Sequence, residues 1–206
     1  MKRGRLITIE GLDGAGKTTL ATGLLTALRR RGVTIELLRE PGGVGTAERI
    51  RSLVKDPALS VSARSEALLY AAARAQLVEQ ALIPILNRGV NVLLDRFVDS
   101  SLAYQGGGRE LGVEAVRAIN AFATGGLAPD LTLLLQIDPA TGRTRTGTRG
   151  DGADRLEQET EPFFVRVAET YATLAATEPG RFRILDASQP PAGVLAAAEA
   201  AVATVL

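Results

Sequence analysis

The sequence predicts an α/β protein, a three-layer sandwich in which a five-stranded parallel sheet carries helices on both faces. Short apolar runs alternate along the chain with longer stretches that have the residue spacing of helices. The short runs are apolar throughout, which is typical of parallel strands that are covered on both sides. Because the 206 residues contain no internal repeat and no long linker, we expect one domain over residues 1–206.

The expected strands span residues 6–10, 34–38, 91–95, 131–137 and 183–186. The expected helices span residues 17–31, 47–54, 62–87, 113–124, 162–177 and 191–206. Gly32 ends the first helix, and Pro84 is expected to bend the long third helix. Two Gly-rich stretches, 39–45 and 141–154, are the least regular and are expected to form mobile loops.

The composition excludes several classes of protein. Hydrophobic residues make up 46% of the chain and charged residues 23%, which favours a globular core. A net charge of +1 gives no long-range attraction to nucleic acid or membranes, and no apolar stretch reaches the roughly 18 residues of a spanning helix. The apolar run at residues 6–9 is too short for a signal peptide, so we expect a cytoplasmic protein. Without histidine, either proton transfer uses a carboxylate or the reaction needs little acid–base help.

A phosphate-binding motif follows the first expected strand and begins the first expected helix. The run matches the pattern G-x-x-x-x-G-K-[ST], in which backbone amides and a helix N-terminus bind phosphate oxygens. The motif therefore predicts a site for a nucleoside triphosphate, in which Lys17 contacts the β- and γ-phosphates and Thr18 holds Mg²⁺. GTPases, partition ATPases, helicases and small-molecule kinases all carry this motif, so it does not name the reaction by itself. The alternative is a chance Gly-rich turn. The predicted ATP-binding residues here are Gly11, Leu12, Asp13, Gly14, Ala15, Gly16, Lys17, Thr18 and Thr19.

Asp95 and Arg96 end the third expected strand, at the same edge of the sheet as the phosphate-binding motif. A carboxylate at this position can hold Mg²⁺ directly or through water. An arginine beside it offers a two-pronged donor for a second phosphate. The alternatives are a helix-capping aspartate and a surface ion pair.

Polar residues that could read an acceptor molecule lie in two further segments. Ser101, Tyr104 and Gln105 follow Arg96 and can contact a base or sugar, although Asp99 or Ser100 could instead cap a helix there. Tyr70 and Arg74 are four residues apart, so they share one helix face and suit stacking on a base and binding a phosphate. The alternative for Tyr70 is a place in the core.

The segment between residues 141 and 160 is unusually rich in arginine and glycine. Phosphoryl transfer spreads negative charge over the transferred group, and cationic side chains stabilise that charge. We therefore interpret residues 141–156 as a lid that brings arginine to the phosphates when it closes. The alternative is a solvated surface loop. The lid arginines are Arg143, Arg145, Arg149 and Arg155.

These motifs together resemble the thymidylate kinase family, in the family's order and over nearly the whole chain. The resemblance rests on Glu10 before the phosphate-binding motif and on four further blocks: Arg39-Glu40-Pro41-Gly42-Gly43, Asp95-Arg96-Phe97 with Ser100-Ser101-x-Ala103-Tyr104-Gln105-Gly106, Asp154-Arg155-Leu156-Glu157 and Ile184-Leu185-Asp186-Ala187. It implies phosphorylation of dTMP to dTDP with ATP and Mg²⁺. It also implies a homodimer packed through helices such as 62–87 and 113–124.

The resemblance implies a role for each acceptor residue. Asp13 would contact the deoxyribose 3′-hydroxyl, Arg74 and Arg96 the acceptor phosphate, and Tyr70 would stack on thymine. Ser101 and Gln105 would lie near the base edge, with Tyr104 beside the sugar. The loop at residues 39–43 would close over the acceptor. The implied dTMP-binding residues are Asp13, Glu40, Pro41, Tyr70, Arg74, Arg96, Ser100, Ser101, Tyr104 and Gln105.

Gly14, together with the arginine-rich lid, resembles a mostly bacterial group of the family in which a lid arginine supplies the catalytic charge. We therefore expect Lys17, Arg96 and either Arg145 or Arg149 to be catalytic. Arg143 would lie against adenine, with Asp186 and Ala187 on its other side. Arg155 would serve either of these roles or pair only with Glu157 or Glu159. Leu156 departs from members that carry an aromatic residue there.

Two other kinds of function fit parts of the sequence. One is a kinase for another acceptor, such as dUMP or a deoxynucleoside. The other is an ATP-gated interaction protein akin to partition ATPases, which would not need Tyr70, Arg74, Arg96 and Gln105 together. An inactive homologue is a third reading, although every catalytic position that the sequence allows us to check is present.

Overall fold

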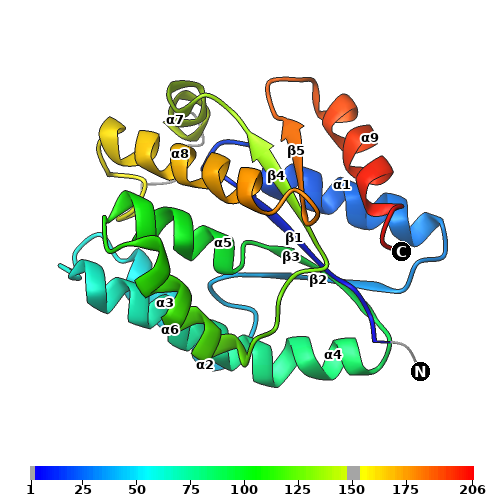
Figure 1. The fold of residues 1–206 in the computed structure, drawn as a ribbon, viewed down its shortest axis with the longest axis horizontal. Coiled ribbons are helices and arrows are strands. Elements are labelled where there is room, and N and C mark those ends of the chain that lie inside the picture. Colours follow the sequence, from blue (N-terminus) through cyan, green and yellow to red (C-terminus); the bar gives the residue numbers. More distant parts are fainter. Residues whose placement is uncertain (1–2, 148–153) are drawn as a thin grey trace.

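The computed structural model describes residues 3–147 and 154–206, and these form an α/β fold around one sheet (Figure 1). The sheet has five strands in the order β2-β3-β1-β4-β5, and every neighbouring pair is parallel. The strands are β1 (Leu6–Gly11), β2 (Ile35–Arg39), β3 (Asn91–Asp95), β4 (Leu131–Gln136) and β5 (Phe182–Asp186). The predicted five-stranded parallel sheet is therefore confirmed, with each strand within two residues of its expected start and end.

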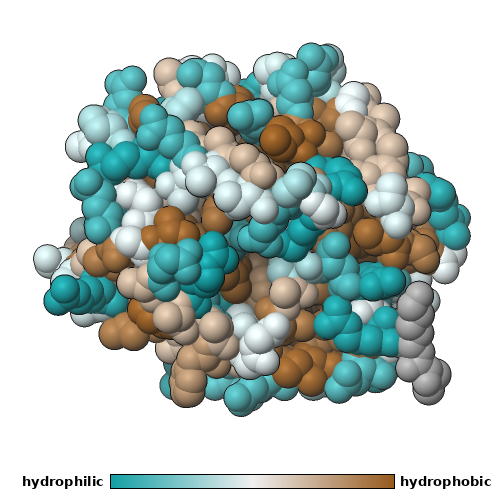
Figure 2. Space-filling view, viewed as in Figure 1, coloured by the Kyte–Doolittle hydropathy of each residue, from teal (hydrophilic) through white to brown (hydrophobic). Residues whose placement is uncertain are grey.

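The connections between strands are helical. The α-helices are α1 (Lys17–Arg30), α2 (Gly45–Lys55), α3 (Ala63–Leu77), α4 (Ile83–Asn87), α5 (Val98–Ser101), α6 (Val113–Thr124), α7 (Pro139–Gly147), α8 (Glu161–Thr177) and α9 (Pro191–Val202). Two segments are π-helical, η1 (Val78–Leu82) and η2 (Leu102–Gly108). None of the helices in the described ranges is both long enough and apolar enough to cross a membrane. The face seen in Figure 2 intersperses hydrophilic and apolar residues.

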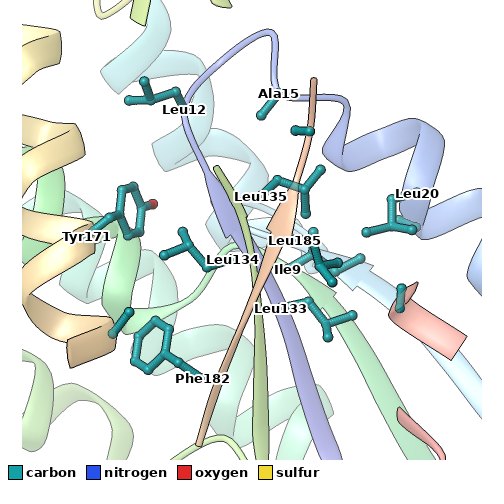
Figure 3. Packing of buried hydrophobic residues seen from close by; sticks show 14 of the residues in the cluster. Ile9, Leu12, Ala15, Leu20, Leu133, Leu134, Leu135, Tyr171, Phe182 and Leu185 are labelled. Carbon is teal, nitrogen blue, oxygen red and sulfur yellow. The ribbon is translucent and has the colours of Figure 1, made fainter. Parts of the chain in front are cut away.

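Alternating side chains of the strands build a core on each face of the sheet. Leu133 and Leu135 of β4 point toward the side of α1, whereas Leu134 points toward Tyr171 of α8 (Figure 3). On β3, Val92 and Leu94 belong to a second apolar cluster, which they form with side chains of η1 and α4. α1 and α9 lie together on one face, and α8 covers the other (Figure 1). Burial on both faces explains why the strands are apolar throughout.

The long helix expected at residues 62–87 is observed as three consecutive helical segments, α3, η1 and α4, with its irregular part just before Pro84. The structure has a π-helical segment at Val78–Leu82, and Pro84 lies in the first turn of α4. A proline has no N–H to donate, and its ring crowds the carbonyl four residues earlier. The wider π-helical turn immediately before it accommodates both effects, so the irregularity precedes the proline.

The loop expected at residues 141–154 is wrong for its first half, because residues 141–147 belong to α7 (Pro139–Gly147). Asp138 caps this helix: its Oδ2 accepts hydrogen bonds from the Thr141 backbone N at 2.9 Å and from Thr141 Oγ1 at 3.1 Å. An aspartate followed by a proline is a helix-start signal, and the glycines obscured it. Residues 148–153 lie outside the described part of the chain.

Three consecutive glycines let η2 lie close against its neighbours. A Cβ on Gly106 would lie 3.1 Å from the Val113 Cα, and one on Gly107 would lie 1.9 Å from Thr170 Oγ1. A Cβ on Gly108 would lie 2.5 Å from the Phe163 ring and 2.8 Å from Val167 Cγ2. These glycines therefore fix the distance between η2 and the helices α6 and α8.

We expect Gly108→Ala to destabilise the protein by about 1–3 kcal/mol, because the buried Phe163 and Val167 side chains cannot move without strain. Urea titration monitored by circular dichroism measures the free energy of unfolding. Gly180→Ala is the matched control, since a Cβ there has no neighbour within 4 Å. Equal stability of the two variants would contradict the close packing of η2.

Candidate active site

A cavity of about 470 Å³ opens at the carboxyl ends of β1 and β3. Its walls come from the phosphate-binding loop, the loop after β2, α2, α3, η2 and the segment from residue 154 to residue 157. Most of the site residues predicted from the sequence line it together. They are Asp13, Gly14, Gly16, Lys17, Thr18, Thr19, Glu40, Pro41, Tyr70, Arg74, Asp95, Arg96, Ser100, Ser101, Tyr104 and Gln105.

The phosphate-binding loop has the backbone that its glycines permit. Gly11, Gly14 and Gly16 have φ values of 134°, 81° and 92°, in the region that L side chains rarely adopt. Gly16 begins α1 without a side-chain cap, so the first amides of this helix stay available for an anion. The Lys17 Nζ donates to the carbonyls of Leu12 at 2.8 Å and Gly11 at 3.2 Å, which holds the lysine along the loop.

The first turn of α7 lies directly on this loop. A Cβ on Gly14 would lie 2.1 Å from the Gly142 carbonyl oxygen, and a Cβ on Gly142 would lie 2.8 Å from the Asp13 carbonyl oxygen. Both contacts are to backbone, which cannot rotate away. The structure therefore has no room for a side chain at position 14, so this position of the loop cannot carry a cationic group.

Arg96 links the phosphate-binding loop to the opposite wall of the cavity. Its Nη2 lies 2.6 Å from Asp13 Oδ1, and its Nη1 donates to the Gly11 carbonyl at 3.0 Å. Tyr104 donates its hydroxyl to Asp13 Oδ2 at 3.0 Å. Burial by itself would raise the pKa of Asp13, but Arg96 and Lys17 hold that pKa well below its usual value. Asp13 is therefore a carboxylate that orients both Arg96 and Tyr104.

Arg96 has a φ of 70°, which is strained for a residue with a side chain. The buried carboxylate of Glu10 fixes the residues that follow it. Glu10 accepts hydrogen bonds from the Phe97 backbone N at 2.7 Å, from Ser100 Oγ at 2.5 Å and from the Tyr171 hydroxyl at 2.9 Å. Ser100 is thereby held where the Arg96 Nη1 can donate to it, at 3.1 Å.

The expectation that Asp99 or Ser100 caps a helix here is wrong. α5 begins at Val98 after Phe97, so both residues lie inside the helix. The Asp99 carboxylate instead pairs with Arg181 at 2.6 Å, and Ser100 binds Glu10. Partners from distant segments outweigh the local capping preference of these residues.

Arg74 is only 1% exposed and contacts protein through all of its guanidinium nitrogens. Nε and Nη2 lie 2.8 and 2.6 Å from Glu40 Oε2, and Nη2 donates to the Phe97 carbonyl at 2.9 Å. Nη1 donates to Ser101 Oγ at 2.9 Å and to the Asn120 side-chain oxygen. Arg74 therefore ties the loop after β2 to α5 and α6 at the wall of the cavity. As predicted from their spacing, Tyr70 shares the cavity face with Arg74.

Two oxygen ligands face each other beside Lys17. Thr18 Oγ1 lies 3.5 Å from Asp95 Oδ2, and Asp95 Oδ1 is buried without a hydrogen-bond partner among the described residues. A buried carboxylate oxygen without a partner is costly unless a ligand satisfies it. Oxygen donors are the ligands that Mg²⁺ prefers, so these two residues fit that ion. The described residues contain no cluster of three or more acidic side chains suited to a metal.

Sequence reasoning missed the part of the wall that α2 contributes. Arg51 and Lys55 line the cavity, and Arg51 Nη1 donates to the Pro41 carbonyl at 2.9 Å. Lys55 Nζ lies 2.6 Å from Asp154 Oδ2, which connects α2 to the end of the predicted lid. The two basic residues are four apart, as Tyr70 and Arg74 are, so the same spacing argument could have found them.

Among the described residues, Arg143 and Arg145 of the predicted lid and the adenine-side residues Asp186 and Ala187 do not line the cavity. The Arg143 guanidinium lies 5.9 Å from the centre of the Phe164 ring, and Arg145 Nη1 donates to the Ala187 carbonyl at 3.1 Å. Asp186 binds its own neighbours, Ser188 and Gln189. Arg149 lies outside the described residues.

Arg155 does not have the partners that were expected. Its Nη2 lies 2.6 Å from Glu66 Oε2, and its Nε donates to the Val54 carbonyl at 3.1 Å, so it pairs with neither Glu157 nor Glu159. The end of the lid is therefore anchored on α2 and α3.

The fold and the phosphate-binding loop define a P-loop phosphotransferase with a polar cavity beside that loop. The comparisons with known proteins give the family. A model of the thymidylate kinase family matches residues 9–197, and the chain belongs to that family.

Relatives in several bacteria support this assignment over most of their length. The thymidylate kinase of Deinococcus radiodurans is 50% identical over 190 residues, which cover 92% of each chain. That of Oenococcus oeni is 51% identical over 196 residues, which cover 93% of this chain and 91% of the relative. That of Alkalilimnicola ehrlichii is 46% identical over 207 residues, which cover 99% of this chain and 94% of the relative.

Glu10 makes the stability of the fold depend on pH. Burial, followed by the charge of Asp99, raises the pKa of Glu10 from 4.5 to about 7. The folded protein thus holds this proton more tightly than the unfolded chain does. The resulting stabilisation is complete below the unfolded pKa and is lost as the pH rises through the folded pKa. We expect wild type to lose roughly 1–3 kcal/mol relative to Glu10→Gln between about pH 4.5 and 7.

Urea titrations of both proteins across this pH range measure the difference in free energy of unfolding. The account predicts a difference that falls with rising pH and is constant above about pH 8. A difference that rises with pH, or that does not change, would contradict the protonated state of Glu10.

Proposed function

We propose that this protein transfers the γ-phosphoryl group of ATP to dTMP and forms dTDP. The observation that carries the proposal is the Asp13–Arg96 ion pair of 2.6 Å, which joins the phosphate-binding loop to a pocket lined by Tyr70 and Gln105. Binding two phosphate-bearing molecules in one cavity is what a nucleoside monophosphate kinase requires. Membership of the thymidylate kinase family supports thymine as the acceptor base.

On the donor side, the amides of residues 11–19 and Lys17 would bind the ATP phosphates. Burial lowers the pKa of Lys17 to about 8, with Arg96 acting in the same direction, so most of the lysine is charged at neutral pH. Thr18 and Asp95 would hold Mg²⁺, which, when bound, neutralises charge on the β- and γ-phosphates. Arg143, Asp186 and Ala187 would lie on the adenine side.

On the acceptor side, Arg96 would bind the dTMP phosphate, with Ser100 and Tyr104 orienting its side chain. Arg74 would add positive charge to the pocket without binding the phosphate directly, because its guanidinium nitrogens already contact protein. Tyr70 would stack on thymine, and Ser101 and Gln105 would lie at the base edge. Asp13 would meet the sugar, while Glu40 and Pro41 would shape the loop over the acceptor.

The transfer needs positioning more than acid–base chemistry. The attacking oxygen of a nucleoside monophosphate is already ionised at neutral pH, so no general base is needed, in agreement with a chain that has no histidine. Arg96 would align the acceptor oxygen with the γ-phosphorus. Lys17 and a lid arginine, Arg145 or Arg149, would stabilise the charge that spreads over the transferred group.

A panel of acceptors with ATP tests the proposal against its nearest rival. We expect dTMP to be phosphorylated with a kcat/KM above that of thymidine, and dTMP to bind without ATP in isothermal titration calorimetry. Thymidine as the better substrate would favour a deoxynucleoside kinase. No dTMP binding and no phosphorylation would favour an ATP-gated interaction protein.

We expect Lys17→Ala to lower the kcat for dTDP formation at least about 100-fold, because one cationic contact to the transferred group is lost. The phosphate-binding loop keeps its glycines, so the variant should unfold at a urea concentration close to that of wild type. Arg30→Ala is the matched control, an exposed basic residue on the same helix that should keep full activity. Wild-type turnover in Lys17→Ala would contradict the mechanism.

We further propose a homodimer that packs through α3 and α6, and a cytoplasmic location where ATP is available. These two helices lie side by side, and their exposed apolar side chains include Phe122, 91% exposed, and Leu68, 56% exposed. An apolar ring this open to water on a helix is a typical interface residue.

We expect Phe122→Asp to convert a dimer into a monomer of 21.6 kDa in light scattering after gel filtration. Val165→Asp on α8 is the control and should leave the dimer intact, because Val165 lies on a different helix. A wild-type protein that is monomeric at micromolar concentration would contradict the proposed interface.

A further inference from the structure

Glu66 is a completely buried carboxylate on α3, directly behind the wall of the cavity. It does not line the cavity, but its neighbour Gln105 does. The Gln105 Nε2 donates to Glu66 Oε1 at 2.8 Å. Two arginines pair with the same carboxylate: Arg109 Nη2 lies 3.0 Å and Arg155 Nη2 lies 2.6 Å from Glu66 Oε2.

The charge of Glu66 decides which end of the Gln105 amide faces it. A carboxylate that is paired with two arginines has only acceptor oxygens to offer, so the NH₂ end of Gln105 must turn toward it. A reversed amide would bring the Gln105 oxygen against the carboxylate, where two acceptors repel each other. No described residue donates a hydrogen bond to Gln105 Oε1. This oxygen is also not among the completely buried polar atoms that lack a partner, so part of it is accessible. The oxygen therefore faces the cavity.

We propose that Glu66 is a specificity-determining residue, which fixes the Gln105 amide so that an acceptor oxygen points at the base. This inference rests on the proposed function, in which the base of the acceptor lies beside Tyr70 and Gln105. An acceptor oxygen matches a pyrimidine that carries a hydrogen on N3, as thymine and uracil do. Cytosine has a lone pair on N3, so it would meet the Gln105 oxygen with two acceptors facing each other.

The same glutamine would suit cytosine if its amide were reversed. The NH₂ group would then face the base and donate to N3 of cytosine, while the oxygen would turn toward position 66. Only the partner behind Gln105 distinguishes the two orientations, because the amide has almost the same shape in both. Glu66 thus selects the substrate through Gln105, without contacting the substrate itself.

The test replaces Glu66 with a residue that can either donate or accept. Glu66→Gln permits both orientations of Gln105, whereas Glu66→Asp keeps an acceptor-only partner and is the matched control. Steady-state kinetics with dTMP, dUMP and dCMP measure the kcat/KM of wild type and both variants. We expect the dTMP-to-dCMP ratio to fall at least about tenfold in Glu66→Gln and to change less than about twofold in Glu66→Asp.

The dUMP-to-dTMP ratio separates a change in hydrogen bonding from general damage to the pocket. Uracil presents the same N3 edge as thymine, so this ratio should stay constant in Glu66→Gln. If the dTMP-to-dCMP ratio of kcat/KM is unchanged in that variant while wild type phosphorylates dTMP normally, the inference about Glu66 is wrong and the proposed function still holds. A wild-type protein that does not phosphorylate dTMP would overturn the proposed function and this inference with it.

Removing a buried charge beside Arg109 and Arg155 could prevent folding of Glu66→Gln, so a second measurement uses wild type. Neutron diffraction of the deuterated dTMP complex locates the amide deuterons directly. The expected result is two deuterons on the Gln105 atom that faces Glu66 and none on the atom that faces N3 of thymine. The reversed pattern would overturn the inference.

Discussion

The ion pair between Asp13 and Arg96 is the interaction on which the rest of the site depends. Asp13 belongs to the loop after β1, and Arg96 follows β3, the neighbouring strand in the sheet. The parallel pairing of these strands brings both residues to one edge, and the ion pair then fixes their side chains. Because each residue also contacts Tyr104, a phosphate donor site and an acceptor pocket share a single network.

The backbone around this ion pair is strained, and buried polar groups maintain it. Arg96 has a φ of 70°, and the loop carrying Asp13 needs three glycines with positive φ. Glu10 accepts hydrogen bonds from the residues after Arg96, and Arg74 pairs with Glu40 in the loop after β2. Strain of this kind persists only where surrounding contacts fix the conformation, and it is common at active sites. The second layer of carboxylates and arginines is therefore what gives the site its geometry.

Much of the fold and part of the site could be predicted from the sequence. The five strands were predictable because burial on both faces makes each of them apolar throughout. The P-loop was predictable because its glycines are needed for a backbone conformation that other residues rarely adopt. Local signals sufficed in both cases. The spacing of Tyr70 and Arg74 also predicted correctly that they share one helix face at the cavity.

Several features that the sequence did not reveal depend on contacts between distant segments. Asp99 pairs with Arg181 instead of capping a helix, and Arg155 pairs with Glu66 instead of a glutamate near it in sequence. The helix at Pro139–Gly147 was missed because its glycines suggested a loop, although Gly142 is small for a different reason: it lies against the P-loop. Local propensity cannot foresee such partners, since it contains no information about which segments meet.

The kinetics of Asp13→Asn test the central claim most directly. If the ion pair is what holds Arg96 toward the acceptor, the kcat/KM for dTMP should fall at least about 100-fold, as expected when one partner of a desolvated charge pair is removed. The affinity for ATP alone, measured by calorimetry, should change less than about threefold, because backbone amides and Lys17 bind the phosphates. An unchanged kcat/KM for dTMP, or an equal loss in ATP affinity, would contradict the account.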